Sequence, residues 1–318
     1  MIKVEVKSNM KKNRGSIAIL LMFVLSMYAC TNTTDKNDGK LKVIVVGTTG
    51  MIADAIENIA GEKAEVQALM GAGVDPHLYK VTQGDLKKLQ DADLIFYNGL
   101  HLEGKMSEVL GKLSAKKKVI AVSDGINKNK IRMLDEKGTV FDPHVWFDVS
   151  IWKEAVLYAS KELQKADSTN IEVYKTNTMN FVNQLDSLDS WVKAEITTIP
   201  VQGRLLITAH DAFGYFGEAY GIEVKGLQGI STVSDYGLSD VTVLVDLITS
   251  RKIKAIFIET SVSDKSIKAV VEGCQAKGHK VVIGGTLYSD AMGQPGTPEG
   301  TYIGMVKANV NTIVKALK

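Results

Sequence analysis

From residue 41 onward, short apolar runs alternate with stretches in which apolar residues recur at three- and four-residue steps. The short runs are rich in β-branched residues and predict buried strands, whereas the longer stretches carry the period of an amphipathic helix. In the first part we expect strands at 41–47, 65–70, 93–97 and 118–122, and helices at 51–59, 82–91, 103–113 and 149–163. Strands that alternate with helices and are apolar throughout are typical of a parallel sheet covered on both faces.

One long amphipathic segment, from about 170 to 198, interrupts this alternation. About 28 helical residues would span roughly 42 Å, which is more than the width of a small domain. Pro200 ends this helix, and we interpret the helix as a rigid strut between two lobes. The second part repeats the pattern of the first, with strands expected at 204–208, 222–227, 255–258 and 280–283 and helices at 214–220, 238–249, 265–276 and 301–317.

The predicted fold class is therefore α/β, with two lobes that each contain a mostly parallel sheet flanked by helices. One long rigid helix joins the two lobes. We expect an N-terminal lobe at 41–165, the linking helix at 166–199 and a C-terminal lobe at 200–318. At 318 residues the chain is long enough for two such cores.

Residues 1–30 carry the pattern of a signal peptide, with basic residues at 11–14 followed by an apolar run at 17–28. This run is too short to span a membrane comfortably. The sequence Ser-Met-Tyr-Ala-Cys that ends at Cys30 resembles a bacterial lipobox, so we expect a lipid on Cys30 and an extracytoplasmic, membrane-anchored protein. Residues 31–40 are polar and predict a flexible tether. Met10 begins a conventional signal, so the true start is Met1 or Met10.

Charge and cysteine content narrow the range of functions. The net charge is only +2, and the basic residues are scattered, which argues against nucleic acid as the main partner. Cys274 is the one cysteine besides Cys30, so no internal disulfide is available once Cys30 carries lipid. Cys274 lies in an apolar-periodic stretch and is expected to be buried.

Candidate metal ligands follow four of the predicted strands. His77, His144 and His210 lie in loops rich in Gly, Pro and Asp, and Asp290 follows the strand that we expect to end at 283. Ligands of parallel α/β sheets bind outside the carboxyl ends of strands. Two candidates precede the strut and two follow it, so facing lobes would bring all four together. We predict one divalent metal site in the cleft between the lobes.

Three imidazoles and one carboxylate suit Zn²⁺, and Mn²⁺ or Fe²⁺ would also fit if the carboxylate binds through both oxygens. Four protein ligands would close a tetrahedral site, whereas a catalytic zinc keeps a position open for water. The ligand set therefore favours binding over catalysis. A metal held by both lobes would also stabilise a closed arrangement.

Four acidic residues near these ligands are expected to accept hydrogen bonds from ligating imidazoles, which fixes the tautomer of the ring. They are Glu259 at a strand end and Asp75, Asp142 and Asp211 beside the ligands. Each of the three aspartates could instead cap a turn or a helix. Asp148 has the sequence context of a helix N-cap.

The two remaining histidines are not expected to bind the metal. His101 follows an Asn-Gly-Leu turn and is assigned to a structural or rim position. His279 precedes a strand, at the wrong edge of the sheet, and is assigned to the surface. The Gly-Thr-Thr-Gly sequence at 47–50 lacks the lysine and the spacing of a phosphate loop.

The loops that carry the candidate ligands also resemble the motifs of a known family. Asp-Pro-His at 75–77, Asp-Pro-His-Val-Trp-Phe-Asp at 142–148, Thr-Ala-His-Asp-Ala-Phe-Gly-Tyr-Phe at 208–216 and Ser-Asp-Ala-Met-Gly at 289–293 are similar to those of the metal-binding substrate-binding proteins of ABC importers, the TroA-like cluster A-I group. The resemblance covers essentially all of 41–318. It implies the four ligands named above and partnership with a membrane permease and its ATPase. It also implies a lipid-anchored receptor, which we expect to be monomeric.

The resemblance leaves the metal open. A histidine at the third ligand position, His210, is the zinc-type choice, so zinc is favoured over manganese. Zinc-type members also carry a His-rich loop, and the corresponding segment 125–140 has no histidine. The treponemal-type member, with three histidines and one aspartate, is the most similar in its ligands and implies both metals.

Two other functions compete with metal import. A periplasmic metallohydrolase would need a solvent-open metal and a general base such as Glu259. A metal-dependent adhesin or interaction lipoprotein would use the metal only to hold its structure. The signal sequence together with the closed ligand set favours the transport receptor, so we do not expect an enzyme.

Overall fold

The computed structural model describes residues 1–2, 42–135, 137–234 and 236–318. It separates into two units, Met1–Leu41 and Lys42–Lys318, and the second unit is described below. The predicted signal peptide, the tether and Cys30 fall on 3–41, so those predictions lie outside the described residues, apart from the first two positions. Within the described part of the chain, no helix has both the length and the apolar character needed to cross a membrane.

The first lobe is built on a four-stranded parallel sheet with the order β2-β1-β3-β4. The strands are β1 (Val43–Gly47), β2 (Ala64–Ala68), β3 (Leu94–Tyr97) and β4 (Lys118–Ala121). The helices are α2 (Gly50–Ala60), α3 (Gln83–Asp91) and α4 (Ser107–Ser114). A Cβ atom on Gly47 would lie 2.8 Å from the backbone nitrogen of Ala53, so glycine is needed where β1 turns directly into α2.

The second lobe contains two pairs of parallel strands in place of one continuous sheet. The pairs are β5 (Leu205–His210) with β6 (Glu223–Gln228), and β7 (Ala255–Glu259) with β8 (Val282–Leu287); β5 also lies next to β7. The helices are α7 (Gly214–Tyr220), α8 (Leu238–Arg251), α9 (Lys265–Ala276) and α10 (Tyr302–Leu317). The predicted α/β class is confirmed. The ends of β5 and β8 were placed too early, because β5 continues to His210 and β8 to Leu287.

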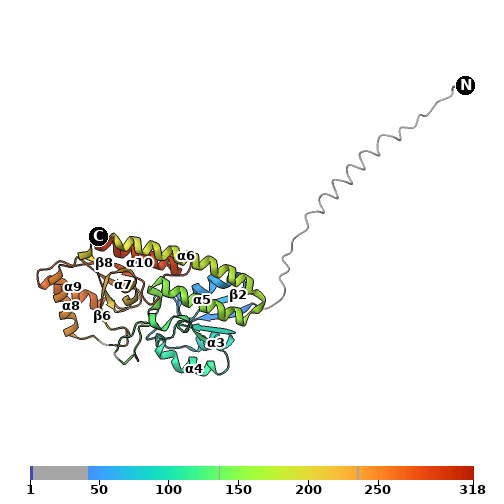
Figure 1. The fold of residues 1–318 in the computed structure, drawn as a ribbon, viewed down its shortest axis with the longest axis horizontal. Helices are drawn as coiled ribbons and strands as arrows, with labels where there is room; N and C mark the ends of the chain where they lie inside the picture. The colour runs from blue at the N-terminus through green and yellow to red at the C-terminus, as the bar shows by residue number, and fades with distance from the viewer. Residues whose placement is uncertain (3–41, 136, 235) are drawn as a thin grey trace. The chain divides into compact units, whose positions relative to one another are not determined.

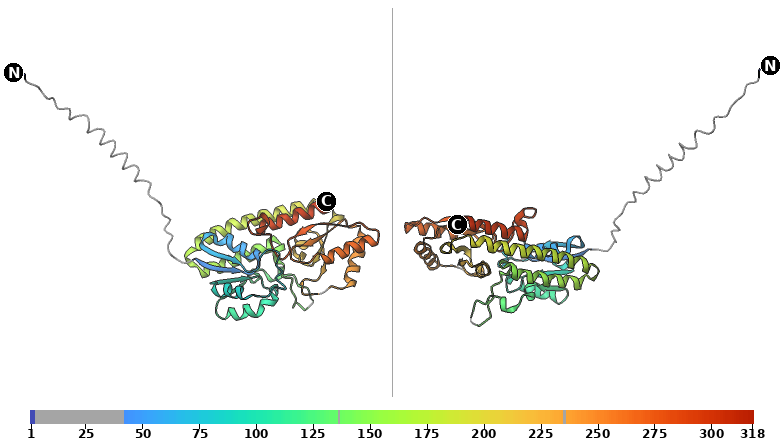
Figure 2. Two further views of the ribbon diagram at one scale, coloured as in Figure 1. Left: turned by 180° about the vertical axis from the view of Figure 1, so that it is seen from behind. Right: turned by 45° about the horizontal axis from the view of Figure 1, so that its top comes forward.

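The predicted strut α6 (Ile171–Thr197), which has 27 residues, connects the lobes, and α5 (Val149–Ala166) precedes it and packs on it. Helix α6 packs on α2 of the first lobe and on α7 and α10 of the second. Figures 1 and 2 show α6 and α10 side by side along the two lobes. The face of α6 that points inward buries seven side chains: Tyr174, Thr178, Phe181, Leu185, Leu188, Val192 and Ile196.

One hydrophobic core runs through both lobes along these helices. The same buried cluster contains Ile52 of α2, Phe181 of α6 and Val310 of α10. Each such side chain contributes about 1.5–3 kcal/mol by leaving water. Because the two lobes bury apolar surface on a shared helix, large separations of the lobes would expose this core.

Several helix starts follow the sequence signals. Thr82 and Asp85 form a reciprocal capping box at α3, and Asp148 accepts the backbone N–H groups of Ser150 and Ile151 at the start of α5.

The expected loop at 125–140 includes a short 3₁₀ turn, Lys128–Lys130, and ends in an antiparallel bridge between Met133 and Phe141. Cys274 is fully buried in the core of the second lobe, as predicted.

A buried carboxylate at the contact between α2 and α10 makes stability depend on pH. Asp54 Oδ2 accepts the backbone N–H of Tyr302 at 3.3 Å, and burial raises the pKa of Asp54 to about 7, aided by the nearby charge of Glu57. In the unfolded chain the pKa is about 3.9. The folded protein therefore holds this proton more tightly, and its free energy of unfolding falls as pH rises from about 4 to about 7.

We predict that Asp54→Asn raises the free energy of unfolding at pH 8 by roughly 2–4 kcal/mol relative to the wild type, and much less at pH 4. The amide can still accept the N–H of Tyr302 but carries no charge. Urea unfolding at both pH values measures the difference. Glu172→Gln, on the solvent face of α6, is the control and should change little at either pH. An equal gain at pH 4 and pH 8 would contradict the assignment.

Candidate metal centre

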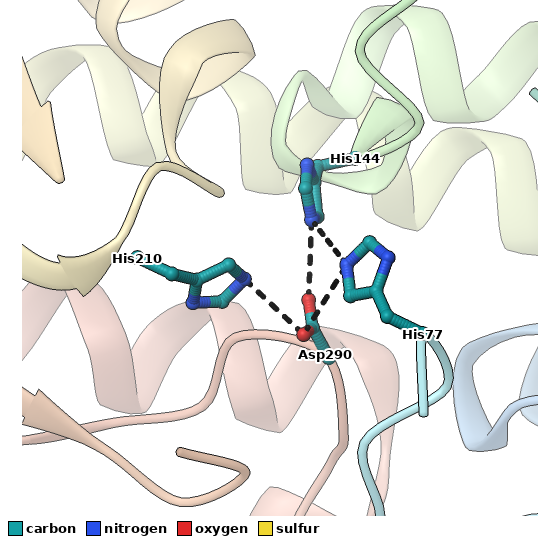
Figure 3. A group of neighbouring side chains, drawn as sticks. All are labelled: His77, His144, His210 and Asp290. Carbon is teal, nitrogen blue, oxygen red and sulfur yellow. Dashed lines mark hydrogen bonds and ion pairs between the residues drawn. The ribbon is translucent and has the colours of Figure 1, made fainter. Parts of the chain in front are cut away.

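Four buried side chains from separate loops and strand ends meet between the two lobes. His77 lies in the loop between β2 and α3, and His144 precedes the short 3₁₀ turn Val145–Phe147. His210 is the last residue of β5, and Asp290 follows β8. One potential ligand atom from each lies within 4.8 Å of the other three. Figure 3 shows the three rings arranged around the carboxylate. The structure thus brings together all four predicted ligands.

Four of the distances between potential ligand atoms are close to those around a single ion. His144 Nε2 lies 3.3 Å from His77 Nε2 and 3.3 Å from Asp290 Oδ1, and His210 Nε2 lies 3.2 Å from Asp290 Oδ2. The longest of the measured contacts, from His77 Nε2 to Asp290 Oδ2, is 3.7 Å. Ligand atoms about 2.0–2.2 Å from a tetrahedral Zn²⁺ are about 3.3–3.6 Å apart. All three histidines present Nε2 to the same point.

The carboxylate of Asp142 holds the ring of His144 on its far side. Asp142 Oδ1 lies 2.8 Å from His144 Nδ1 and also accepts the backbone N–H of His144 at 3.0 Å. A proton on Nδ1 leaves the lone pair of Nε2 free to face the centre. Burial opposes the charged form of His144, but the bonds and charges of Asp142 and Asp290 outweigh it and raise the pKa of His144 to about 9.

Glu259, at the end of β7, lies behind His210, with an ion-pair contact to the ring that lacks hydrogen-bond geometry and a hydrogen bond to the backbone. Its Oε2 atom lies 2.5 Å from His210 Nδ1, and its Oε1 atom accepts the backbone N–H of His210 at 2.9 Å. Burial again opposes protonation, yet the charges of Glu259 and Asp290 raise the pKa of His210 well above its usual range. Both oxygens of Glu259 are thus occupied by the same histidine.

His77 is held differently. Its backbone N–H donates to Asp75 Oδ1 at 2.8 Å, but among the residues described here only the carboxylate of Asp290 forms an ion pair with its ring. Burial, which the charge of Asp290 only partly offsets, lowers the pKa of His77 to about 4. The other oxygen of Asp75 accepts the hydroxyl of Thr232, in the second lobe, at 2.6 Å. Asp75 therefore orients the loop of His77, not its imidazole.

Asp211 does not act on a ring in this arrangement. Its backbone N–H donates to the carbonyl of Gln228, which continues the pairing of β5 with β6. In the described part of the chain, its partly buried carboxylate makes no hydrogen bond with any of the three imidazoles. Asp75, Asp142 and Glu259 thus contact candidate ligands, and Asp211 does not.

Asp290 is the least compensated group of the cluster. Both carboxylate oxygens are buried and accept no hydrogen bond from any residue that the structure describes. Burial would raise its pKa, but the charges and contacts of His210 and His144 hold the pKa of Asp290 well below its usual range. An ionised carboxylate buried in this way costs several kcal/mol unless a cation or a set of donors compensates it. The cluster has the donor set and the unmet charge of a divalent-cation site.

Several polar contacts that no sequence motif indicates hold the ligand loops in register. The indole N–H of Trp146 donates to the carbonyl of Ser289 at 3.0 Å, directly beside Asp290. The hydroxyl of Tyr302 donates to the carbonyl of Trp146 at 2.7 Å, and Asn98 Nδ2 donates to the carbonyl of Pro143 at 2.9 Å. The Trp146 contact ties the His144 loop to the Asp290 loop of the second lobe, the Tyr302 contact ties it to α10, and the Asn98 contact holds it to the end of β3 within the first lobe.

The other two histidines lie outside the cluster. His101 is exposed, with a backbone φ of 65°, and lines a separate cavity of about 410 Å³ next to β3 and β4. His279 is partly buried, and its Nε2 atom is 2.7 Å from the carbonyl of Ile253, to which it can donate.

Two lobes on a shared long helix, with a buried cluster of histidines and a carboxylate between them, define the class of two-lobed binding proteins that enclose a small ligand. The family model described as "Zinc-uptake complex component A periplasmic", ZnuA, matches residues 45–316. The chain belongs to this family, as the resemblance of its loop motifs implied.

Relatives and solved structures agree with this assignment. The chain is 51% identical over 305 residues to the manganese-binding lipoprotein MntA of Bacillus subtilis, covering 96% of this chain and 99% of the relative. It is 50% identical over 276 residues to the zinc-binding protein TroA of Treponema pallidum, covering 87% of this chain and 89% of the relative. The structure of the periplasmic zinc-binding protein TroA from T. pallidum aligns with a TM-score of 0.85 at 49% identity, over 87% of this chain and 99% of that one. The predicted TroA-like fold is confirmed.

We predict that the imidazoles of His77 and His144 titrate far apart in the chelator-treated protein. His77 should lose its proton near pH 4 and His144 near pH 9, so that at pH 7 His77 is neutral and His144 is charged. NMR of the imidazole nitrogens across pH 4–10 measures both. Asp142→Asn should lower the pKa of His144 and is the matched test of the cause. Titration of both rings near pH 6.5 would contradict the environments described.

Proposed function

We propose that this protein is the extracytoplasmic solute-binding protein of a metal ABC importer. It captures one Zn²⁺ or Mn²⁺ ion between its lobes with His77, His144, His210 and Asp290 and passes the ion to a membrane permease driven by its ATPase. The observation that carries this proposal is the carboxylate of Asp290, which is buried, has no hydrogen-bond partner among the described residues and faces three Nε2 atoms. Membership of the zinc-uptake family supports it.

The geometry supports binding rather than catalysis. A hydrolase with this ligand set would need a general base within reach of a metal-bound water. Glu259 is the candidate base, but both of its oxygens contact His210, on the side of the ring that faces away from the other ligands. Four buried ligands also leave no protein-defined open position. We therefore propose that the protein is a receptor and not an enzyme.

The choice of metal depends on how Asp290 binds. Relatives of nearly equal identity are named for manganese and for zinc. Asp290 directs Oδ1 toward His144 and Oδ2 toward His210 and His77, so either one or both oxygens can reach a central ion. One oxygen would complete a tetrahedral zinc site, and two would add the oxygen ligation that manganese prefers. We propose Zn²⁺ and Mn²⁺ as the two cargo candidates.

Anchoring and domain limits are part of the same proposal. A lipid on Cys30 would tether the protein to the outer face of a membrane through residues 31–40. The lobes at 41–165 and 200–318, with the strut at 166–199, would then act as a monomeric receptor above the permease. The lipoprotein name of MntA, which spans the same region of sequence, supports the anchor.

We predict that His144→Ala abolishes stoichiometric metal binding, with an affinity at least about 100-fold weaker than that of the wild type. The protein is stripped with a chelator, and binding is measured by elemental analysis and by competitive titration of Zn²⁺ against Mn²⁺. His101→Ala is the matched control, because it removes an imidazole outside the cluster.

Unchanged stoichiometry and affinity in His144→Ala would refute the proposed site. Loss of metal uptake in cells on deletion of the gene would support the importer. Metal-dependent adhesion to a host ligand, with uptake intact, would overturn the importer in favour of an adhesin.

We predict that Cys30→Ser moves the protein from the membrane fraction to the soluble extracytoplasmic fraction, because the thiol is the only attachment point for the lipid. Fractionation and labelling with a radioactive fatty acid measure this change. His144→Ala should stay in the membrane fraction, because it alters the metal site alone. Retention of the label in Cys30→Ser would contradict the lipidation.

A further inference from the structure

Arg132 connects the His144 side of the metal site to the opposite lobe. Its Nη1 atom pairs with Asp142 Oδ2, and its Nε atom pairs with Glu218 Oε1 at 2.6 Å. Asp142 belongs to the first-lobe loop that carries His144, whereas Glu218 lies on α7 of the second lobe. One guanidinium therefore joins the carboxylate behind a proposed ligand to a helix of the other lobe.

The backbone around Arg132 reinforces this connection. Its N–H donates to the hydroxyl of Tyr215, also on α7, at 3.0 Å, and that hydroxyl donates to the carbonyl of Asp142 at 3.0 Å. The carbonyl of Arg132 accepts the N–H of Asp142 at 3.0 Å, next to the bridge between Met133 and Phe141. This pairing holds Arg132 directly opposite Asp142.

The start of α7 is shaped to admit the guanidinium. A Cβ atom on Gly214 would lie 1.6 Å from Arg132 Nη1, so any other residue there would displace the arginine. The guanidinium also lies over the ring of Tyr215, with 5.6 Å between its carbon and the ring centroid. The side chain of Arg132 is only 22% exposed and that of Asp142 is fully buried, so this pair is stronger than a surface pair, whereas Glu218 is 66% exposed.

The two carboxylates behind the histidines, those of Asp142 and Glu259, differ in whether they also pair with a basic side chain. Asp142 uses Oδ1 for His144 and Oδ2 for Arg132, so both oxygens are fixed in orientation. Glu259 contacts His210 through both oxygens, and it forms no ion pair with any lysine or arginine in the described ranges. Within the part of the chain that the structure describes, only the His144 side thus has a permanently charged partner that reaches across the lobes.

We infer that Arg132 is a positioning residue that couples the closed arrangement of the lobes to the orientation of His144. In the closed arrangement α7 holds Arg132, Arg132 holds the carboxylate of Asp142, and that carboxylate holds the imidazole toward the metal. Separation of the lobes would remove Glu218 and Tyr215 from Arg132 and so loosen His144. The inference rests on the proposed function, because it needs His144 to bind the metal.

The experiment measures the rate at which bound Zn²⁺ or Mn²⁺ leaves the full-length mature protein when a chelator is added in excess. Arg132→Met, which keeps the length of the side chain but loses both ion pairs, should accelerate dissociation about tenfold, the lower range for residues that orient metal ligands. Arg132→Lys should accelerate dissociation less than Arg132→Met, because lysine keeps the charge without the two-armed geometry of the guanidinium.

Two further variants change the geometry without touching Arg132 itself. Gly214→Ala displaces the guanidinium and should accelerate dissociation in the same direction. Glu218→Gln removes only the charged partner on the second lobe and should have a smaller effect, about two- to threefold. Arg251→Met is the matched control, since it breaks the exposed pair with Glu223, 2.5 Å apart, elsewhere in the second lobe.

A purely structural role predicts a different result. In that case Arg132→Met would lower the melting temperature, while the dissociation rate and the visible spectrum of the Co²⁺-substituted protein would match the wild type. That result, or an equal acceleration in Arg251→Met, would overturn the inference. A failure of the proposed function is recognised separately, because wild type and His144→Ala would then show no difference in metal binding. If Arg132→Met fails to fold, Gly214→Ala and Glu218→Gln decide the question alone.

Discussion

The buried charge of Asp290 is the constraint around which the ligand-binding cleft is organised. A fully buried carboxylate is unfavourable unless positive charge lies near it, and here two of the three surrounding imidazoles, His144 and His210, can supply that charge. In the absence of metal, protons on His144 and His210 partly compensate the carboxylate, which is why the pKa values of these two rings are raised. A divalent cation would replace those protons. Metal and protons thus compete for the same charge, and acid should weaken binding.

The carboxylates behind the rings determine which histidine carries the proton. Asp142 and Glu259 stabilise the charged form of their rings, whereas His77 has only a backbone link to Asp75 and is neutral over most of the pH range. His77 therefore presents a lone pair to an incoming ion without first losing a proton. The site thus combines one neutral imidazole, that of His77, with two imidazoles, those of His144 and His210, whose basicity is raised by the carboxylates beside them.

Periodicity was enough to predict the α/β class, the strut and the location of all four candidate ligands, because strand ends and Asp-Pro-His sequences are local signals. The exact ends of β5 and β8 were not predictable, since pairing with β6 and β7 extends each strand beyond its apolar run. The different roles of Asp75, Asp142 and Asp211 were likewise hidden. All three lie within two residues of a candidate ligand, and only the fold decides which carboxylate faces a ring. Arg132 carried no signal either, because it is one charged residue in a polar loop and gains its meaning from contacts with α7.

The shared core limits how the site can open. Helix α6 and helix α10 bury one continuous apolar cluster with both lobes, so wide separation would expose several of its large side chains to water at about 1.5–3 kcal/mol each. Small shifts of the lobes expose far less of this core. Even so, a small shift is enough to break the polar contacts across the lobes, such as those of Trp146 with Ser289 and of Arg132 with Glu218. Because these contacts hold the loops that carry His144 and Asp290, a small movement of the lobes is sufficient to disturb the metal site. A receptor of this build can therefore release a bound ion without a wide hinge motion.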